Sequence, residues 1–152
     1  MEIISYQPRY QATFRDLNVE WLEKYFFVEP VDEEVLQHPE KYIIAPGGTI
    51  FLARLPEGVV GTVALMKLEE GVFELTKMAV TGAAQGKKIG QKLMQHAIDY
   101  ARQQNWKKLI IYTNSGLVNA VHIYKKYGFV EIPIEPGVQY ERADIKMKLD
   151  LS

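Results

Sequence analysis

Cysteine is absent from the 152 residues of the chain. The sequence therefore excludes disulfide bonds, a thiol nucleophile and a metal site built on thiolate ligands. Histidine is scarce, because only His38, His96 and His122 are present and they are isolated from one another. No group of carboxylates has the spacing of a metal site either, so the sequence gives no reason to invoke a metal.

The chain also lacks an excess of charge and a long apolar run. Its 18 basic and 19 acidic residues leave a formal net charge of −1, which argues against a nucleic-acid or membrane surface built on bulk charge. No apolar run approaches the ~20 residues of a membrane-spanning helix, and the N-terminus lacks the regions of a signal peptide. We therefore expect a cytoplasmic protein that binds neither nucleic acid nor a membrane, with a single domain over residues 1–152.

Hydrophobic periodicity and turn residues predict the element order βααβββαβαββ. Strands are expected at 2–6, 49–55, 59–68, 72–80, 108–113, 129–132 and 143–149, and those from 49 to 80 are expected to form an antiparallel meander. Helices are expected at 8–25, from an N-cap at Asp32 to near Pro39, at 86–105 and at 117–127. This order indicates an α+β fold, with a mixed, mostly antiparallel sheet of about seven strands flanked by helices.

The strand at 72–80 and the next helix are joined by a glycine-bearing turn that is suited to bind a phosphate. The start of a helix leaves backbone N–H groups without partners, and Gly86 and Gly90 allow a ligand close to the backbone. The spacing fits neither a P-loop nor a dinucleotide fingerprint. It does fit a glycine pattern of the type Q-G-x-G-x-G, except that Lys88 stands in place of a glycine. Lys88 is expected to keep a negative φ angle.

This segment, QGKKIG, resembles motif A of the GNAT superfamily of acyl-CoA-dependent N-acetyltransferases. The run at 120–129, AVHIYKKYGF, resembles motif B of that family, A-x-x-x-Y-x-x-x-G-F. The resemblance implies the GNAT fold, acetyl-CoA as cofactor, and transfer of its acetyl group to a primary amine of a small molecule, a peptide or a protein. It places the pantetheine arm between two parallel strands that splay apart, and the pyrophosphate at the Gly86 turn. The implied partners are acetyl-CoA and the amine acceptor, while a homodimer stays an open alternative.

Two residues are candidates for the chemistry, because acyl transfer needs a neutral amine and a proton for the departing thiolate. Glu74 matches the position of the general base in some members of the family, and a carboxylate in an apolar groove has a raised pKa that suits a base. The alternative is a solvated strand residue paired with Lys77 or with a lysine on a neighbouring strand. Tyr124 matches the motif-B tyrosine, which the resemblance assigns to protonating the thiolate; the alternative is a core aromatic residue.

The resemblance also implies residues for binding. Contacts to the cofactor are expected from Met78, Ala79, Val80, Gln85, Gly86, Lys87, Lys88, Ile89 and Gly90. Leu117 stands where many members carry an asparagine, so Asn114 and Asn119 are alternatives for a contact to pantetheine. The acceptor pocket is expected to contain Trp21, Tyr25, Phe26, Phe27, Tyr140, Glu141 and Arg142. Two other functions stay open on the same fold, a non-catalytic CoA-binding module and a plain interaction protein.

Overall fold

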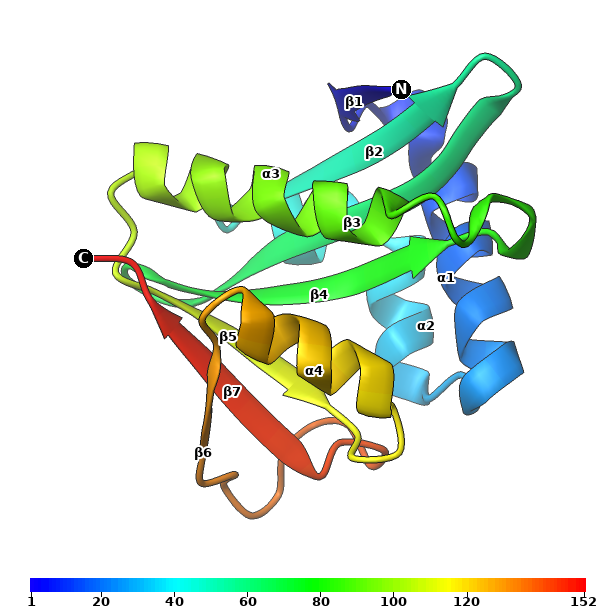
Figure 1. The fold of residues 1–152 in the computed structure, drawn as a ribbon. Helices are drawn as coiled ribbons and strands as arrows, with labels where there is room; N and C mark the ends of the chain where they lie inside the picture. Colours follow the sequence, from blue (N-terminus) through cyan, green and yellow to red (C-terminus); the bar gives the residue numbers. More distant parts are fainter.

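The computed structural model describes residues 1–152, and one seven-stranded sheet runs through it (Figure 1). In chain order the strands are β1 (Glu2–Ser5), β2 (Thr49–Leu55), β3 (Gly58–Glu69), β4 (Val72–Val80), β5 (Lys108–Thr113), β6 (Val130–Ile132) and β7 (Ile145–Asp150). The helices are α1 (Gln11–Tyr25), α2 (Pro30–Gln37), α3 (Ile89–Gln103) and α4 (Val118–Lys126). Across the sheet the order is β1-β2-β3-β4-β5-β7-β6, and only β4 and β5 pair in parallel. The predicted α+β class and element order are confirmed.

The sheet separates two hydrophobic cores. Helices α3 and α4 cover one face and α1 and α2 cover the other (Figure 1). Side chains alternate between the faces of a strand, so in β2 Phe51 and Ala53 enter the core under α3 while Ile50 and Leu52 enter the core under α1 and α2. The longest helices, α1 and α3, have 15 residues each, and no helix is long and apolar enough to cross a membrane.

The predicted start of α3 was wrong, because the helix begins at Ile89 and not at Gly86. Gly86 has a φ angle of 89° and Lys88 has a φ angle of 59°, so both lie in the left-handed region and cannot continue a right-handed helix. The expectation of a negative φ at Lys88 was therefore also wrong. A lysine in this conformation costs about 1–2 kcal/mol relative to a right-handed one. This cost arises because Lys88 occupies the position where the Q-G-x-G-x-G pattern has its second glycine.

The start of α2 differs from the prediction as well. The N-cap is Glu29 and the first helical residue is Pro30, a position that proline favours because its missing N–H would have no helical partner there. Asp32 is the third helical residue, and its Oδ2 accepts a hydrogen bond from the Glu29 N–H at 3.0 Å. Asp32 therefore caps α2 from inside the first turn, with its carboxylate buried.

The ends of several other helices and strands differ from the predicted ends by one to three residues. The helix predicted at 8–25 is divided into a 3₁₀ turn at Pro8–Tyr10 and α1. A π-helical turn at Glu40–Ile44 and a 3₁₀ turn at Gly82–Ala84 were not predicted. The last strand begins at Ile145 instead of Ala143.

Two irregularities of β4 create space for a site in the middle of the sheet. Strand β4 pairs with β5 only over Val72–Glu74, whereas β5 stays paired with β7 as far as Thr113. Beyond Glu74 the two parallel strands separate, as the family resemblance implied, and the β4 edge has no strand partner on that side. In addition, Lys77 has a φ angle of 52° within a β-bulge, where Lys77 and Met78 both lie opposite Val63; such bulges redirect side chains and bend a strand.

Candidate active site

The larger of the two main cavities lies between the end of β4, the turn that follows it, and helices α3 and α4. Its volume is about 520 Å³. Of the residues predicted to contact the cofactor, Met78, Val80, Gln85, Gly86, Lys88, Ile89, Gly90 and Asn119 line this cavity. Three others do not: Ala79 is buried in the sheet, Lys87 is an exposed residue of the turn, and Asn114 lines a different cavity. The turn and the end of β4 therefore form one continuous wall.

At the α3 end of this wall, the groups available to a ligand are backbone N–H groups and not side chains. Lys88 is the N-cap of α3 and makes no capping hydrogen bond with its side chain, and the first turn contains no acidic residue. The N–H groups of a helical first turn have no intrahelical partners, so they point toward any group that lies in the cavity. A Cβ atom added at Gly86 would have no protein atom within 4 Å. The space in front of this glycine is thus free for a ligand.

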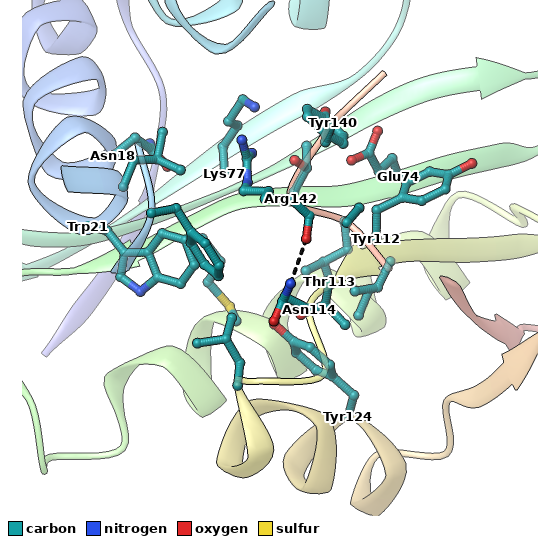
Figure 2. A pocket seen from close by; sticks show the side chains of 18 residues that line it. Asn18, Trp21, Glu74, Lys77, Tyr112, Thr113, Asn114, Tyr124, Tyr140 and Arg142 are labelled. Atoms are coloured by element: carbon teal, nitrogen blue, oxygen red, sulfur yellow. Dashed lines mark hydrogen bonds between the residues drawn. The ribbon is translucent and has the colours of Figure 1, made fainter. Parts of the chain in front are cut away.

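The smaller cavity lies between α1, the splayed ends of β4 and β5, and the loop before β7 (Figure 2). Its volume is about 90 Å³. Met78 and Tyr124 line both cavities. The two spaces are therefore adjacent at this pair of residues, near the gap between the two parallel strands.

Glu74 lies at the deep end of the smaller cavity, on β4. The residue is only 1% exposed, and its Oε1 atom has no hydrogen-bond partner. Burial raises the pKa of this carboxyl group, and the positive charge of Lys77 opposes the effect only in part. The alternative of a solvated residue paired with Lys77 is wrong, because Lys77 makes its ion pair with Asp32. A buried carboxyl with a raised pKa can take up a proton near neutral pH.

A cluster of four charged residues, of which Glu29, Asp32 and Lys77 are buried and Arg142 is mostly buried, lies behind the smaller cavity. Of these four, sequence reasoning predicted only Arg142 as a member of the acceptor site. The Lys77 ammonium lies 3.0 Å from Asp32 Oδ1. The Arg142 guanidinium lies 2.7 Å from Asp32 Oδ2 and 2.8 Å from Glu29 Oε2. Burial alone would raise the pKa of Asp32, but the hydrogen bonds and charges of Arg142 and Lys77 outweigh it and lower the pKa. We call Glu29, Asp32, Lys77 and Arg142 the ionic cluster.

Sequence signals for this cluster exist but are weak. Pro30 at a helix start would have placed Glu29 at the N-cap, and Lys77 is a lysine inside an otherwise largely apolar strand. Neither signal identifies the partner, because Arg142 is 110 residues away from Asp32 in the chain. Arg142, which was predicted to contact the acceptor, lines the cavity while both carboxylates hold its guanidinium.

Tyr140 is fixed by this cluster. The Lys77 ammonium lies 4.9 Å from the centre of the Tyr140 ring, and the Arg142 guanidinium carbon lies 4.8 Å from it. The ring is 3% exposed, and its hydroxyl group has no hydrogen-bond partner. Burial and the nearby Glu74 charge raise the pKa of Tyr140 well above its usual value, so the phenol keeps its proton. Figure 2 shows Tyr140 and Glu74 at the same end of the cavity.

Tyr124 projects from α4 to the junction of the two cavities. Burial raises the pKa of its phenol to about 12, so the group is protonated at neutral pH and can act as a proton donor. Its ring packs edge-on against Phe129, with 6.2 Å between ring centres. Tyr124 thus packs against the hydrophobic core and also lines both cavities.

The two candidate asparagines lie in different cavities. Asn114 lines the smaller one, where its Nδ2 donates to the Arg142 carbonyl at 2.7 Å and its Oδ1 accepts from the Gly116 N–H at 2.7 Å (Figure 2). Its amide group therefore holds the loop before β7. Asn119 lines the larger cavity and is the one of the pair that is placed to contact a cofactor there.

The aromatic residues at the end of α1 and directly after it fall into two groups. Trp21 and Phe26 line the smaller cavity, and their ring centres are 5.8 Å apart. Tyr25 and Phe27 were also predicted for the acceptor pocket, but they are 42% and 52% exposed and do not line the cavity. They flank Phe26 in sequence and point outward.

Comparison with known proteins identifies the family. A family model described as the acetyltransferase (GNAT) family matches residues 12–129. The chain is 29% identical over 127 residues to the protein named probable N-acetyltransferase camello of Xenopus laevis, covering 75% of this chain and 58% of that protein. It is 32% identical over 92 residues to N-acetylaspartate synthetase of Mus musculus, covering 59% of this chain and 31% of that protein. The chain thus spans less than two thirds of the length of these relatives.

Solved structures share the whole fold at low sequence identity. A GNAT-family acetyltransferase from Staphylococcus aureus superposes with a TM-score of 0.88 at 23% identity, over 99% of both chains. The spermidine N-acetyltransferase of Vibrio cholerae, solved with CoA and spermine, gives a TM-score of 0.75 at 20% identity, over 99% of this chain and 95% of that one. An acetyltransferase from Salmonella typhimurium, solved with acetyl-CoA, gives 0.77 at 18% identity, over 100% and 94%. Because the family model covers most of the chain, the protein belongs to the acetyltransferase (GNAT) family.

Proposed function

We propose that the protein binds acetyl-CoA in the larger cavity and transfers the acetyl group to a primary amine held in the smaller one. The observation that carries this proposal is that Met78 and Tyr124 line both cavities, so that the two spaces are adjacent. Both substrates can then be bound at once, so the amine attacks directly in a ternary complex. No residue of the chain needs to carry the acetyl group, which agrees with the absence of cysteine.

The residues of the larger cavity fit acetyl-CoA. The β4 edge beyond Glu74 is free of a strand partner, and such an edge can pair with an extended amide chain like pantetheine. The N–H groups at the start of α3 and the helix dipole favour an anion, which suits the pyrophosphate. When bound, acetyl-CoA supplies a thioester whose carbonyl carbon accepts the amine. In this proposal Met78, Val80, Gln85, Gly86, Lys88–Gly90 and Asn119 contact the bound cofactor.

Two side chains move the protons. Glu74 takes one proton from the ammonium form of the acceptor, directly or through a water molecule, and so frees the nitrogen lone pair. As the new C–N bond forms and the C–S bond breaks, Tyr124 gives its proton to the sulfur. The second proton of the attacking nitrogen returns to Tyr124 through solvent, and Glu74 releases its own proton to bulk water. The balance is one acetylated amine, one free thiol and one proton.

The test is calorimetry with acetyl-CoA followed by mass spectrometry of a panel of small primary amines. We expect binding, and a gain of one acetyl group on at least one amine together with release of free CoA. No binding at millimolar acetyl-CoA would refute the proposal. Binding without any acetylated product, across small amines and peptides, would instead identify a CoA-binding module on this fold.

A further inference from the structure

The smaller cavity has a polar end and an apolar end. Glu74 and Tyr140 lie at the polar end, against the ionic cluster. Trp21 and Leu22 of α1, together with Phe26 and Leu117, supply most of the apolar lining, and Figure 2 shows Trp21 opposite Glu74, with the uncharged Asn18 beside it. The chemistry of the two ends specifies the molecule that fits between them.

Two unpaired polar atoms mark the polar end. Glu74 Oε1 and the Tyr140 hydroxyl belong to residues that are only 1% and 3% exposed. Neither atom makes a well-formed hydrogen bond in the protein, even though the two side chains lie near each other. A buried polar atom without a partner costs free energy, so these atoms favour a ligand that satisfies both. A carboxylate only accepts hydrogen bonds, and a phenol oxygen can accept one. An ammonium group, with several N–H donors and a positive charge, satisfies both.

The positive charges that line the cavity are already neutralised. Lys77 and Arg142 are its lining cations, and Asp32 and Glu29 hold them at 2.7–3.0 Å. These two cations and two carboxylates sum to zero, so ionised Glu74 gives the site a charge of −1. A ligand carboxylate would enter a buried site that has no free counter-charge and would lie near Glu74. Like charges in a buried site repel strongly, because little water screens them.

The apolar end determines which chemical groups fit in the part of the ligand that lies away from the ammonium group. Trp21, Leu22, Phe26 and Leu117 offer no carboxylate to a second ammonium group. A cavity of about 90 Å³ is smaller than the ~150 Å³ cavity that accepts a benzene molecule. A short alkyl chain fits such a space and buries apolar surface there.

From these observations we infer that the acceptor is a small primary amine with an apolar body and no carboxylate, bound through its ammonium group by Glu74 and Tyr140. The inference rests on the proposed function, since it names the substrate class of that site. It separates alkylamines from amino acids and from diamines, three classes that all carry the reacting amine.

The experiment compares three ligands that differ by one group each. Pentylamine is the reference, norleucine adds a carboxylate beside the same amine, and cadaverine adds a second amine at the far end. Each is titrated calorimetrically into the free protein and into the protein saturated with CoA. We expect pentylamine to bind about tenfold or more tightly than either of the others, because each added charge loses its hydration without gaining a partner. Norleucine or cadaverine binding as tightly as pentylamine, or no binding of pentylamine, would overturn the inference.

A variant of Glu74 tests whether pentylamine binding depends on the polar end of the cavity. Glu74→Gln keeps the size of the side chain and removes its charge, so pentylamine should bind about tenfold more weakly to it. Glu70→Gln is the matched control, because Glu70 lies in the turn before β4 with its side chain 91% exposed, and it should leave binding unchanged. Equal pentylamine affinity in wild type and Glu74→Gln would contradict the assignment of Glu74 to the ammonium group.

Product analysis separates this inference from the proposed function. If pentylamine binds but no amine gains an acetyl group, the proposed function fails and the binding preference stands. If norleucine is acetylated in preference to pentylamine, the proposed function stands and the inference fails.

Discussion

The two cavities are built in opposite ways. The larger one depends on backbone groups from one short segment, the end of β4 and the turn into α3, where residues 85–88 are exposed. The smaller one depends on side chains from α1, α2, β4 and the loop before β7, where Glu29, Asp32, Glu74, Lys77 and Tyr140 are all buried. A backbone site tolerates many side chains, whereas a side-chain site changes with every substitution.

This contrast matches the different requirements of a cofactor site and an acceptor site. The cofactor is the same for all members of an acetyl-CoA-dependent family, so a site made of N–H groups and a helix dipole can serve it with few fixed residues. The acceptor differs from one member to another, so its site is made of the groups that substitution can alter. We therefore expect substitutions in the ionic cluster to affect folding and acceptor binding, and substitutions in the turn to affect cofactor binding much more than acceptor binding.

The largest effect is expected when the ionic cluster is broken. Asp32→Ala leaves the buried Lys77 ammonium and the Arg142 guanidinium with one carboxylate fewer, which should lower the free energy of unfolding by about 3–5 kcal/mol. Asp16→Ala removes an acid whose side chain is 73% exposed and should change it by less than about 0.5 kcal/mol. Urea denaturation measures both. A loss below about 1 kcal/mol for Asp32→Ala would mean that the cluster does not hold the smaller cavity together.

The next effect concerns the junction of the cavities. Tyr124→Phe should lower kcat about 100-fold, the usual scale for loss of a general acid, with little change in acetyl-CoA affinity. Tyr127→Phe, at the C-cap of the same helix, is the matched control, because the Tyr127 hydroxyl makes only a 3.5 Å contact to Gln91, and this variant should keep its activity. Steady-state kinetics with the best amine measure both. An unchanged kcat in Tyr124→Phe would mean that the thiolate takes its proton from water.

A third effect is a change in pH dependence. Glu74 acts as a base only when ionised, so the rate should fall as the pH falls through its pKa. Burial raises this pKa, so the acidic limb should lie above the usual glutamate value of about 4.3. Glu74→Gln should lower the rate and remove this limb, while the exposed Glu70→Gln should keep it. A pH profile of unchanged shape in Glu74→Gln would assign the base to another group.

The backbone character of the larger cavity predicts a fourth result. Gly86→Val should weaken acetyl-CoA binding about tenfold or more, because valine is strained at a φ angle of 89° and fills the space in front of the turn. Lys87→Ala together with Lys88→Ala should weaken it less, since each exposed lysine contributes about 0–1 kcal/mol. Calorimetry compares the two variants, with circular dichroism to confirm that both fold. A greater loss in the double alanine variant would show that side-chain charge, and not the turn, anchors the pyrophosphate.

The smallest effect is expected at the left-handed lysine. Lys88→Gly relieves a φ angle of 59° but adds freedom to the unfolded chain, so we expect a net gain of no more than about 1 kcal/mol in the free energy of unfolding. Lys87→Gly brings only the added freedom of the unfolded chain, because Lys87 has no positive φ, and should lose stability. Thermal unfolding of the two variants measures the difference. A loss of stability in Lys88→Gly equal to that in Lys87→Gly would show that the turn is not strained.

The same contrast explains what the sequence could predict. The order of elements, the α3 stripe of Ile89, Leu93, Met94 and Ala97, and the anion-binding turn all follow from local patterns of spacing. The family motifs are local as well, so the location of the larger cavity could be predicted. The left-handed Lys88 could not, because its conformation comes from the turn and not from lysine itself.

The smaller cavity was predictable only in part. Glu74 and Tyr140 were identified through the family resemblance, but the partnership of Asp32 with Lys77 and Arg142 joins segments 45 and 110 residues apart. No local pattern encodes such pairs, because they depend on the bulge at Lys77 and on the path of the loop before β7. Tyr25 and Phe27 were predicted for the cavity for the related reason that sequence does not show which of several adjacent aromatic residues turns inward.

The most direct test of the central claim, that two separate cavities form one site, is an amide chemical-shift titration by NMR in two steps. CoA is added first, and we expect shifts at Met78–Gln91 and at Asn119–Tyr124, with Glu29, Asp32 and Tyr140 unchanged. Pentylamine is then added to the CoA-saturated protein, and we expect shifts at Glu74, Lys77 and Tyr140 that converge with the first set only at Met78 and Tyr124. Shifts from the amine that fall on the α3 turn, or shifts from CoA that centre on the ionic cluster, would contradict the account.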